Sequence, residues 1–178
     1  MQPLRADAAR SRERILSVAR DHDPTDLRFN DLAREAGVGV GTVYRHFATA
    51  QALREALATE TLLRMRDVSR VAEAEPDAVL ALHGFLREAL RLQLEDGGLQ
   101  AVILSPDDEA DEVRELKREI FGTFTTVLAR ARSAGVVRAD VGVEQLQHLV
   151  CGVEHAVRVG SPRDRELFLE VMLAGLRA

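Results

Sequence analysis

The chain has 178 residues and a formal net charge of −5, with 46% hydrophobic, 30% charged and only 4% aromatic residues. This length suits one domain or a small domain joined to a larger one, and a composition rich in Ala, Leu, Val, Arg and Glu favours packed helices over a β-sandwich. The single Cys151 excludes an internal disulfide, and no segment resembles a membrane span or a signal peptide. We therefore expect a cytoplasmic protein.

Charge is unevenly distributed along the chain. Residues 1–47 carry 8 Arg against 7 Asp and Glu, whereas residues 48–178 carry 16 basic and 22 acidic side chains. A near-neutral head on an acidic body is compatible with DNA binding, because only the docking face has to be positive. The distribution permits a nucleic-acid partner without identifying one.

Helical periodicity covers nearly the whole chain, and turn-forming residues divide it into about nine segments. The first three helices are expected over residues 4–20, 29–36 and 40–47. Pro24 and the aspartates around it separate the first helix from the second. Gly37 ends the second helix, because glycine adopts the left-handed conformation of a helix C-terminus.

The remaining helices follow similar punctuation. Thr49 is a candidate N-cap for a fourth helix that continues to about residue 71. Ser105-Pro106 and the carboxylates after it are typical of a helix start and predict a helix over 106–134. Other helices are expected over 76–95, 99–104, 143–157 and 162–176, the last with Asp164 placed as in a capping box. The predicted fold class is all-α, with no strands and no internal repeat.

Residues 31–47 read D-L-A-R-E-A-G-V-G-V-G-T-V-Y-R-H-F, which predicts a helix, a tight turn and a short second helix. A turn of three or four residues sets two helices at the steep angle of a helix-turn-helix. The core between them is expected to contain Leu32, Ala33, Val38, Val43 and Phe47. The outward face of the second helix carries groups that bond phosphates or base edges, and Gly41 allows close backbone approach: Val40, Gly41, Thr42, Tyr44, Arg45 and His46.

The run from Asp31 to Phe47, together with Ile15-Leu16 before it and Ala52-Leu53 after it, resembles the head of the tetracycline-repressor (TetR/AcrR) family. The likeness is most specific at Gly-Thr-Val-Tyr-Arg-His-Phe. The body is similar in its length, its helix count, the run from residue 134 to 141 and the ending Gly-Leu-Arg-Ala. The resemblance implies a three-helix DNA-binding head over residues 1–48 and a ligand-binding, dimerising body over residues 49–178.

The resemblance also implies residue roles. Thr42, Tyr44, Arg45 and His46 would contact DNA, with Arg45 on a phosphate or a guanine, and Thr49 would cap the fourth helix near the phosphates. The chain departs from the family where Gly39 replaces a capping hydroxyl and where Val40 and Ala50 replace basic residues. Arg28 is expected to substitute as a phosphate contact. Because these basic residues are missing, we expect fewer phosphate contacts than in a typical relative, and binding that is sensitive to salt. The full set of residues predicted to bind DNA is Arg28, Val40, Gly41, Thr42, Tyr44, Arg45, His46 and Thr49.

The function implied is that of a homodimeric repressor released from double-stranded operator DNA by a small apolar effector, with no enzymatic activity, cofactor or membrane partner. The last two helices are predicted to form the dimer interface, and the alternative is that they pack within one chain. The predicted interface residues are Leu146, Leu149, Val150, Val153, Leu167, Phe168, Val171, Met172 and Leu176. Eight residues are predicted to line an effector pocket, and the alternative is that they simply pack in the helical core: Leu62, Met65, His83, Phe85, Phe121, Phe124, His148 and Cys151.

Three further hypotheses remain open on sequence grounds. His148, Cys151 and His155 are spaced to share one helix face, which would suit a metal or thiol sensor, but a packed face is the favoured interpretation and no metal is expected. A helical enzyme or carrier that retains such a head would turn over a bound substrate. An adaptor controlled by another protein would keep a packed, empty body.

Overall fold

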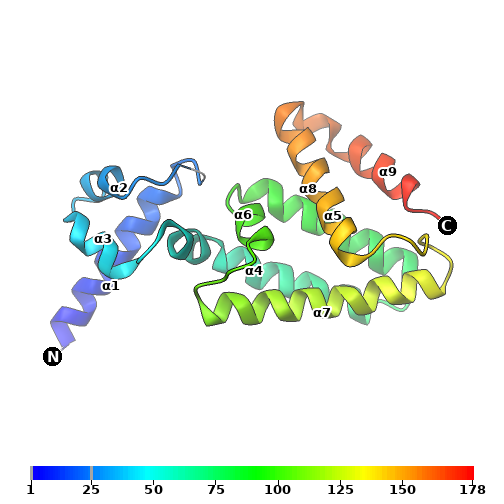
Figure 1. Cartoon of the computed structure of the whole chain (residues 1–178), viewed down its shortest axis with the longest axis horizontal. Coiled ribbons are helices and arrows are strands. Elements are labelled where there is room, and N and C mark those ends of the chain that lie inside the picture. The colour runs from blue at the N-terminus through cyan, green and yellow to red at the C-terminus, as the bar shows by residue number, and fades with distance from the viewer. Residues whose placement is uncertain (1, 25) are drawn as a thin grey trace. The chain divides into compact units, whose positions relative to one another are not determined.

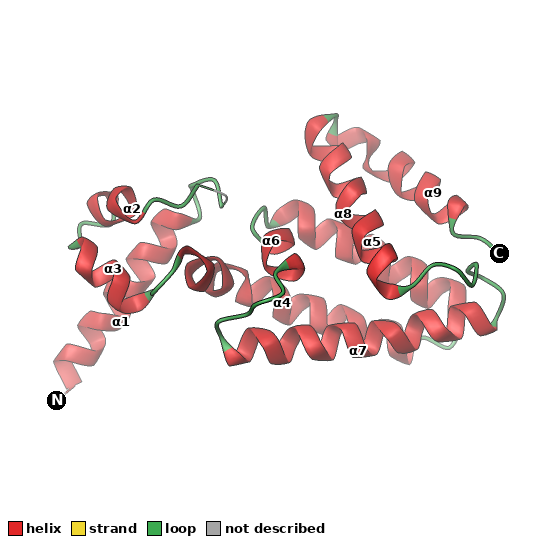
Figure 2. Ribbon diagram, in the orientation of Figure 1, coloured by secondary structure: helices red, strands yellow, loops and turns green. Residues whose placement is uncertain are grey.

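The computed structural model describes residues 2–24 and 26–178. In these residues all regular structure is helical, which confirms the predicted all-α fold (Figures 1 and 2). A 3₁₀ turn, Pro162–Asp164, precedes the last helix. The α-helices are α1 (Gln2–Ala19), α2 (Phe29–Glu35), α3 (Val40–His46), α4 (Ala50–Ala74), α5 (Ala78–Glu95), α6 (Leu99–Leu104), α7 (Asp111–Ser133), α8 (Val143–Val159) and α9 (Arg165–Gly175).

The chain divides into two compact units. The first combines residues 1–60 with residues 97–114, so α1, α2, α3 and the start of α4 share a unit with α6. The second combines residues 61–96 with residues 115–178 and contains α5, α8 and α9. The three N-terminal helices thus have a partner segment that comes from much later in the chain.

The core of the first unit forms where α1, α2 and α3 pack on one another. Four of the five residues predicted for the helix-turn-helix core, Leu32, Ala33, Val43 and Phe47, are buried, and Val38 is half-buried against them. The remaining core side chains come mostly from α1 and the segment leading into α2: Ile15, Leu16, Ala19, Leu27, Phe29, Ala36 and Leu53. Burial of this apolar set fixes α3 on the other two helices.

The turn between α2 and α3 depends on Gly37. Its φ of +64° lies in the left-handed region, which side-chain-bearing residues rarely adopt. The Gly37 N–H donates to the Arg34 carbonyl at 3.3 Å, and the Val38 N–H donates to the Ala33 carbonyl at 2.9 Å. This pair of bonds is the Schellman arrangement, which closes the end of a helix and redirects the chain.

The predicted start of α7 at Pro106 is wrong, since the helix begins at Asp111 and residues 105–110 form a loop. The cause is Glu55 of α4, which is fully buried. Its carboxylate accepts the N–H of Glu109 at 2.9 Å and the N–H of Ala110 at 2.8 Å. A helix from Pro106 would direct the Ala110 amide to its own backbone, and the carboxylate takes that amide instead.

In the second unit α5 packs on α8, and α8 packs on α9. The apolar stripe predicted for α7 is buried throughout: Val113, Leu116, Ile120, Phe124, Val127 and Ala131. The capping box predicted at Asp164 is replaced by the 3₁₀ turn, in which the Ser161 hydroxyl accepts the Arg163 N–H at 3.3 Å, so α9 starts at Arg165. None of the helices within the described ranges is long and apolar enough to cross a membrane.

We predict that Glu55→Gln lowers the free energy of unfolding by about 1–3 kcal/mol, because an amide supplies one acceptor oxygen where two buried N–H groups need acceptors. Urea denaturation at fixed protein concentration measures the change. Glu60→Gln, an exposed change on the same helix, is the control and should alter the midpoint little. Equal midpoints for the wild type and Glu55→Gln would contradict the assignment.

Candidate nucleic-acid interface

Helix α3 turns one apolar residue, Val43, into the core and leaves the rest of its surface toward solvent. Tyr44 is 57% exposed and Val40 is 39% exposed. Gly41 and Arg45 are also exposed, whereas Thr42 and His46 are half-buried. All six residues that the sequence placed on the outward face of this helix therefore retain solvent-accessible surface.

The phenol of Tyr44 is held by an aromatic contact with α2. The rings of Tyr44 and Phe29 lie 5.0 Å apart, centroid to centroid, with their planes at 62°. Edge-to-face contacts of this kind are favourable for aromatic rings. Phe29 is buried, so it anchors the Tyr44 ring while leaving the hydroxyl at the surface.

Arg45 lies folded along its own helix. Its Nε–H donates to the Gly41 carbonyl at 3.1 Å, and Nη2 donates to the Thr42 hydroxyl at 2.9 Å. Two side chains predicted to contact DNA are thus bonded to each other. A phosphate or a guanine that engages the Arg45 fork has to compete with these two bonds.

Arg28, the predicted substitute phosphate contact, precedes α2 and is exposed. Its Nε lies 3.1 Å from Oδ1 of Asp26. The hydrogen bond to Asp26, and then the charge of that carboxylate, raise the pKa of Arg28 above its ordinary value. The guanidinium is therefore charged but already has an anionic neighbour, which competes with any phosphate.

Thr49 caps α4 as the sequence predicts, since its hydroxyl oxygen accepts the Ala52 N–H at 3.0 Å. The same hydroxyl donates to the carboxylate of Glu109, in the loop before α7. Glu109 lies 60 residues further along the chain, so no local sequence pattern connects the two residues. The Thr49 hydroxyl, which the resemblance places near the DNA phosphates, thus already donates its proton to a carboxylate.

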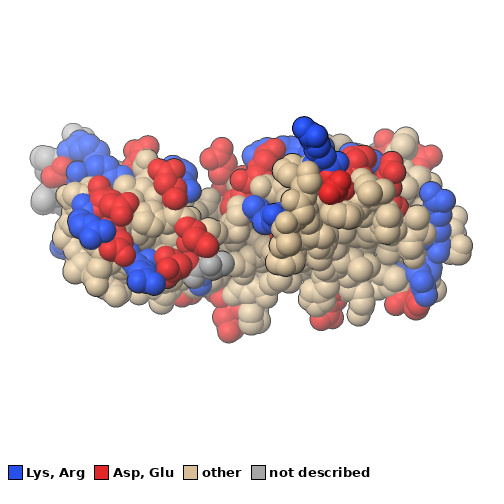
Figure 3. All heavy atoms as spheres, turned by 90° about the horizontal axis from the view of Figure 1, so that it is seen from above, with Lys and Arg blue, Asp and Glu red and all other residues tan. Residues whose placement is uncertain are grey.

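The first unit presents acidic and basic side chains interspersed over the face drawn in Figure 3, rather than one continuous basic area. Several of its charged groups have polar partners: Arg34 contacts Asp31 at 3.0 Å, and the His22 ring lies 2.8 Å from the Glu35 carboxylate. The Arg12 guanidinium covers the ring of Phe47 at 5.2 Å. The expectation of few phosphate contacts stays a prediction.

The residues predicted for an effector pocket divide by exposure. Leu62, Met65, Phe85, Phe124 and Cys151 are buried, His83 and Phe121 are half-buried, and His148 is exposed. The rings of Phe85 and Phe124 stack with centroids 4.3 Å apart. Burial, and after it the charges of Arg177 and Arg87, lower the pKa of His83. The buried residues of the predicted pocket therefore pack as the side chains of a helical core do.

The shared face expected for His148, Cys151 and His155 does not form a common site. Cys151 is buried, and its Sγ lies 3.8 Å from Oε1 of Gln93, whereas both histidines are exposed. Across residues 2–24 and 26–178, no group of three His, Cys, Asp or Glu side chains is placed to hold a metal ion. The buried thiol belongs to the packing between α5 and α8.

The residues predicted for a dimer interface lie on α8 and α9 and divide in the same way. Leu146, Val150, Met172 and Leu176 are buried within the protomer, and Val153 and Phe168 are half-buried. Leu149, Leu167 and Val171 are 43%, 56% and 63% exposed. An apolar hollow runs along the two helices, and six of the nine predicted residues line it: Leu149, Val153, Phe168, Val171, Met172 and Leu176.

The fold and the α2–α3 surface define a helix-turn-helix protein with a helical body. Residues 15–57 match the family model described as bacterial regulatory proteins, tetR family. Residues 75–178 match a second model, described as the C-terminal domain of SbtR-like transcriptional regulators. The chain belongs to the TetR family of DNA-binding transcriptional regulators, as its sequence predicts.

Three solved structures illustrate what the chain is similar to. A TetR transcription regulatory protein from Mycobacterium vanbaalenii is 34% identical over 99% of this chain and 100% of its own, with a TM-score of 0.46. The regulator SCO0520 from Streptomyces coelicolor is 29% identical over 93% and 98% of the two chains, with a TM-score of 0.54. FadR from Bacillus subtilis, solved with stearoyl-CoA, shares the fold at 15% identity over 95% and 99%, with a TM-score of 0.60. A search of curated proteins found no match.

Proposed function

We propose that this regulator is a homodimeric, cytoplasmic repressor that binds a palindromic operator through α3 and is released by a small apolar effector. The observation that carries the proposal is the outward face of α3, where Thr42, Tyr44, Arg45 and His46 surround Gly41. Two copies related by twofold symmetry would place their α3 helices in successive major grooves, about 34–36 Å apart.

The chemistry of that face suits a major groove. A Cβ at Gly41 would meet nothing within 4 Å, so the glycine leaves open surface where a groove wall can approach the helix backbone. Tyr44 and His46 supply donors for phosphates, and the Arg45 fork matches the paired acceptors of guanine. Arg45 would exchange its bonds with Gly41 and Thr42 for bonds with DNA.

Dimerisation through α8 and α9 is supported by the apolar hollow along them. Its wall includes Gly152, Ala156 and Gly175, whose small size allows a partner helix to approach closely. Exposed Leu149 and Val171 would gain burial against a second copy. One short recognition helix offers little contact area, so operator binding needs the second protomer.

Release by an effector is supported by the division into two units, because a ligand in the second unit can act on DNA binding only by favouring one arrangement of the dimer. A coupling free energy of about 1–3 kcal/mol weakens operator binding by roughly 5- to 150-fold. FadR, which shares this fold, was solved with stearoyl-CoA. Stearoyl-CoA carries a long apolar chain, and the effector proposed here shares with it only a large apolar surface.

We predict that Tyr44→Phe and Arg45→Ala each weaken binding to DNA from the protein's own upstream region at least tenfold. Phenylalanine keeps the ring contact with Phe29 and removes only the hydroxyl, so the loss reports hydrogen bonding rather than misfolding. Fluorescence anisotropy across a salt series measures the change. Arg163→Ala, which removes an exposed charge in the second unit, is the control. Binding that is equal on random DNA and insensitive to both α3 variants would refute the proposal.

We predict that Glu109→Gln strengthens operator binding about two- to fivefold at low salt, because it removes a negative charge bonded to the Thr49 hydroxyl at the proposed phosphate contact. Glu112→Gln removes the same charge from an exposed position in the first turn of α7 and is the matched control. Equal gains from both variants would assign the effect to net charge and exclude a local contact.

We predict that Leu149→Glu combined with Val171→Glu converts the dimer to a monomer, because two carboxylates would enter a desolvated apolar contact in each protomer. Sedimentation velocity at micromolar concentration measures the change. Val79→Glu, a comparably exposed apolar residue in the first turn of α5, is the control and should remain dimeric. A dimer that survives the double substitution would place the interface elsewhere.

A further inference from the structure

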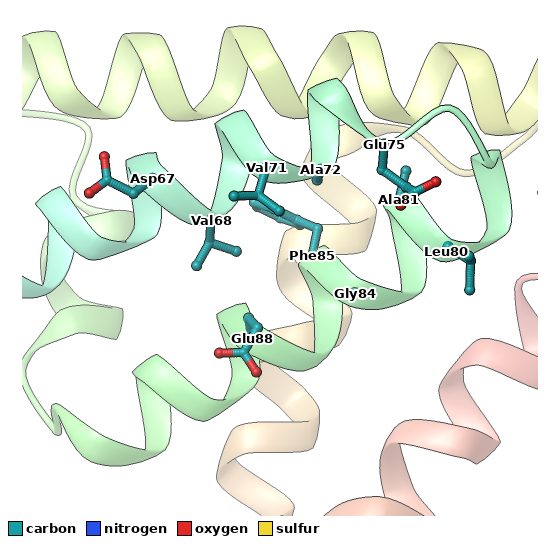
Figure 4. Close-up of a pocket in the computed structure, with 10 residues that line it drawn as sticks. All are labelled: Asp67, Val68, Val71, Ala72, Glu75, Leu80, Ala81, Gly84, Phe85 and Glu88. Atoms are coloured by element: carbon teal, nitrogen blue, oxygen red, sulfur yellow. The ribbon is translucent and has the colours of Figure 1, made fainter.

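A groove of about 340 Å³ lies between α4 and α5 in the second unit (Figure 4). Four residues of α4, Glu75 directly after it and five residues of α5 line the groove. This volume falls within the range of small-molecule sites in proteins. Among the residues predicted for the effector pocket, Phe85 is in its wall, and the groove is otherwise a site that the sequence did not indicate.

The floor of the groove is apolar. Phe85, Ala72 and Ala81 are buried beneath it, while Val71 is 72% exposed and Leu80 is 61% exposed on its flanks. Gly84 contributes to the hollow, because a Cβ there would meet nothing within 4 Å. An apolar ligand would therefore cover two large exposed side chains that the protomer leaves open to water.

The charged residues that line the groove are all acidic: Asp67, Glu75 and Glu88. Figure 4 shows their carboxylates at separate edges of the apolar floor. Asp67 contacts Arg66 at 3.0 Å, Glu75 accepts the Asp77 N–H at 3.0 Å, and Glu88 contacts Arg91 at 2.8 Å. Each carboxylate makes these contacts through one oxygen, and the arginine partners stand outside the groove.

We propose that the groove binds a lipophilic organic cation, such as a phosphonium or quaternary ammonium ion with apolar substituents. The apolar floor removes the substituents from water, and the carboxylates at its edges attract the cationic centre. The carboxylates repel an anion of the same shape, which makes charge the basis of selection. The inference deepens the effector step of the proposed function and rests on that function for its regulatory consequence.

Isothermal titration of the full chain with tetraphenylphosphonium tests the binding step. Tetraphenylborate, which has the same shape and the opposite charge, is the matched ligand. We expect saturable binding of the cation, one per chain, with at least tenfold preference over the borate. Glu88→Gln should reduce that preference, because it removes one of the selecting charges. Equal affinity for the two ions, or no binding of the cation, would overturn the proposal.

Filling the groove tests its location. Gly84→Leu places a side chain in the hollow and replaces a helical glycine with a better helix former, so the fold is retained. We expect it to weaken cation binding at least tenfold. Gly122→Leu, at another exposed helical glycine with open space around it, is the control and should bind as the wild type does. Unchanged affinity in Gly84→Leu would refute the site.

These titrations contain no DNA, so they separate this inference from the proposed function. Cation binding that is lost in Gly84→Leu supports the groove even where operator binding fails. Operator binding that depends on Tyr44 and Arg45 stands even where the cation does not bind.

Discussion

The carboxylate of Glu55 is fully buried and bonds two backbone amides that lie 54 and 55 residues further along the chain. Removing a carboxylate from water is unfavourable unless hydrogen bonds replace those of the solvent. Here both oxygens accept backbone N–H groups, and the Gln51 amide adds a third donor at 3.0 Å. The start of α4, the 105–110 loop and the start of α7 are thereby held in one unit. The contact between Thr49 and Glu109 depends on this arrangement, since the Glu109 amide is one of those bonded.

The α3 surface combines recognition chemistry with competing contacts inside the protein. Arg45 bonds Thr42 and Gly41, Arg28 contacts Asp26, and Thr49 donates to Glu109. In the proposed complex each of these contacts would be exchanged for a contact with DNA, which would lower the net gain from binding. On the proposed model, the second protomer and the ionic strength would then be decisive for operator occupancy.

Local patterns in the sequence were sufficient for most of the fold. The turn at Gly37 and the buried stripe of α7 follow from backbone sterics and helical periodicity, which act over a few residues. The start of α7 was predicted wrongly because Ser105-Pro106 is a local helix signal that a distant carboxylate overrides. Glu109 was missed for the same reason, since its partner Thr49 lies 60 residues away. The α4–α5 groove was missed because a hollow depends on how two helices pack, which helical periodicity alone does not give. The outward face of α3 was predictable because one helix supplies all of it.

The most direct test of the account is a hydroxyl-radical footprint of the full-length protein on its own upstream DNA. Two α3 helices in successive major grooves predict two protected stretches on one face of the duplex, centred about 10–10.5 base pairs apart and related by a palindrome. Both stretches should disappear together in Arg45→Ala. A single protected stretch, or uniform protection that follows no palindrome, would contradict recognition by a symmetric pair of α3 helices.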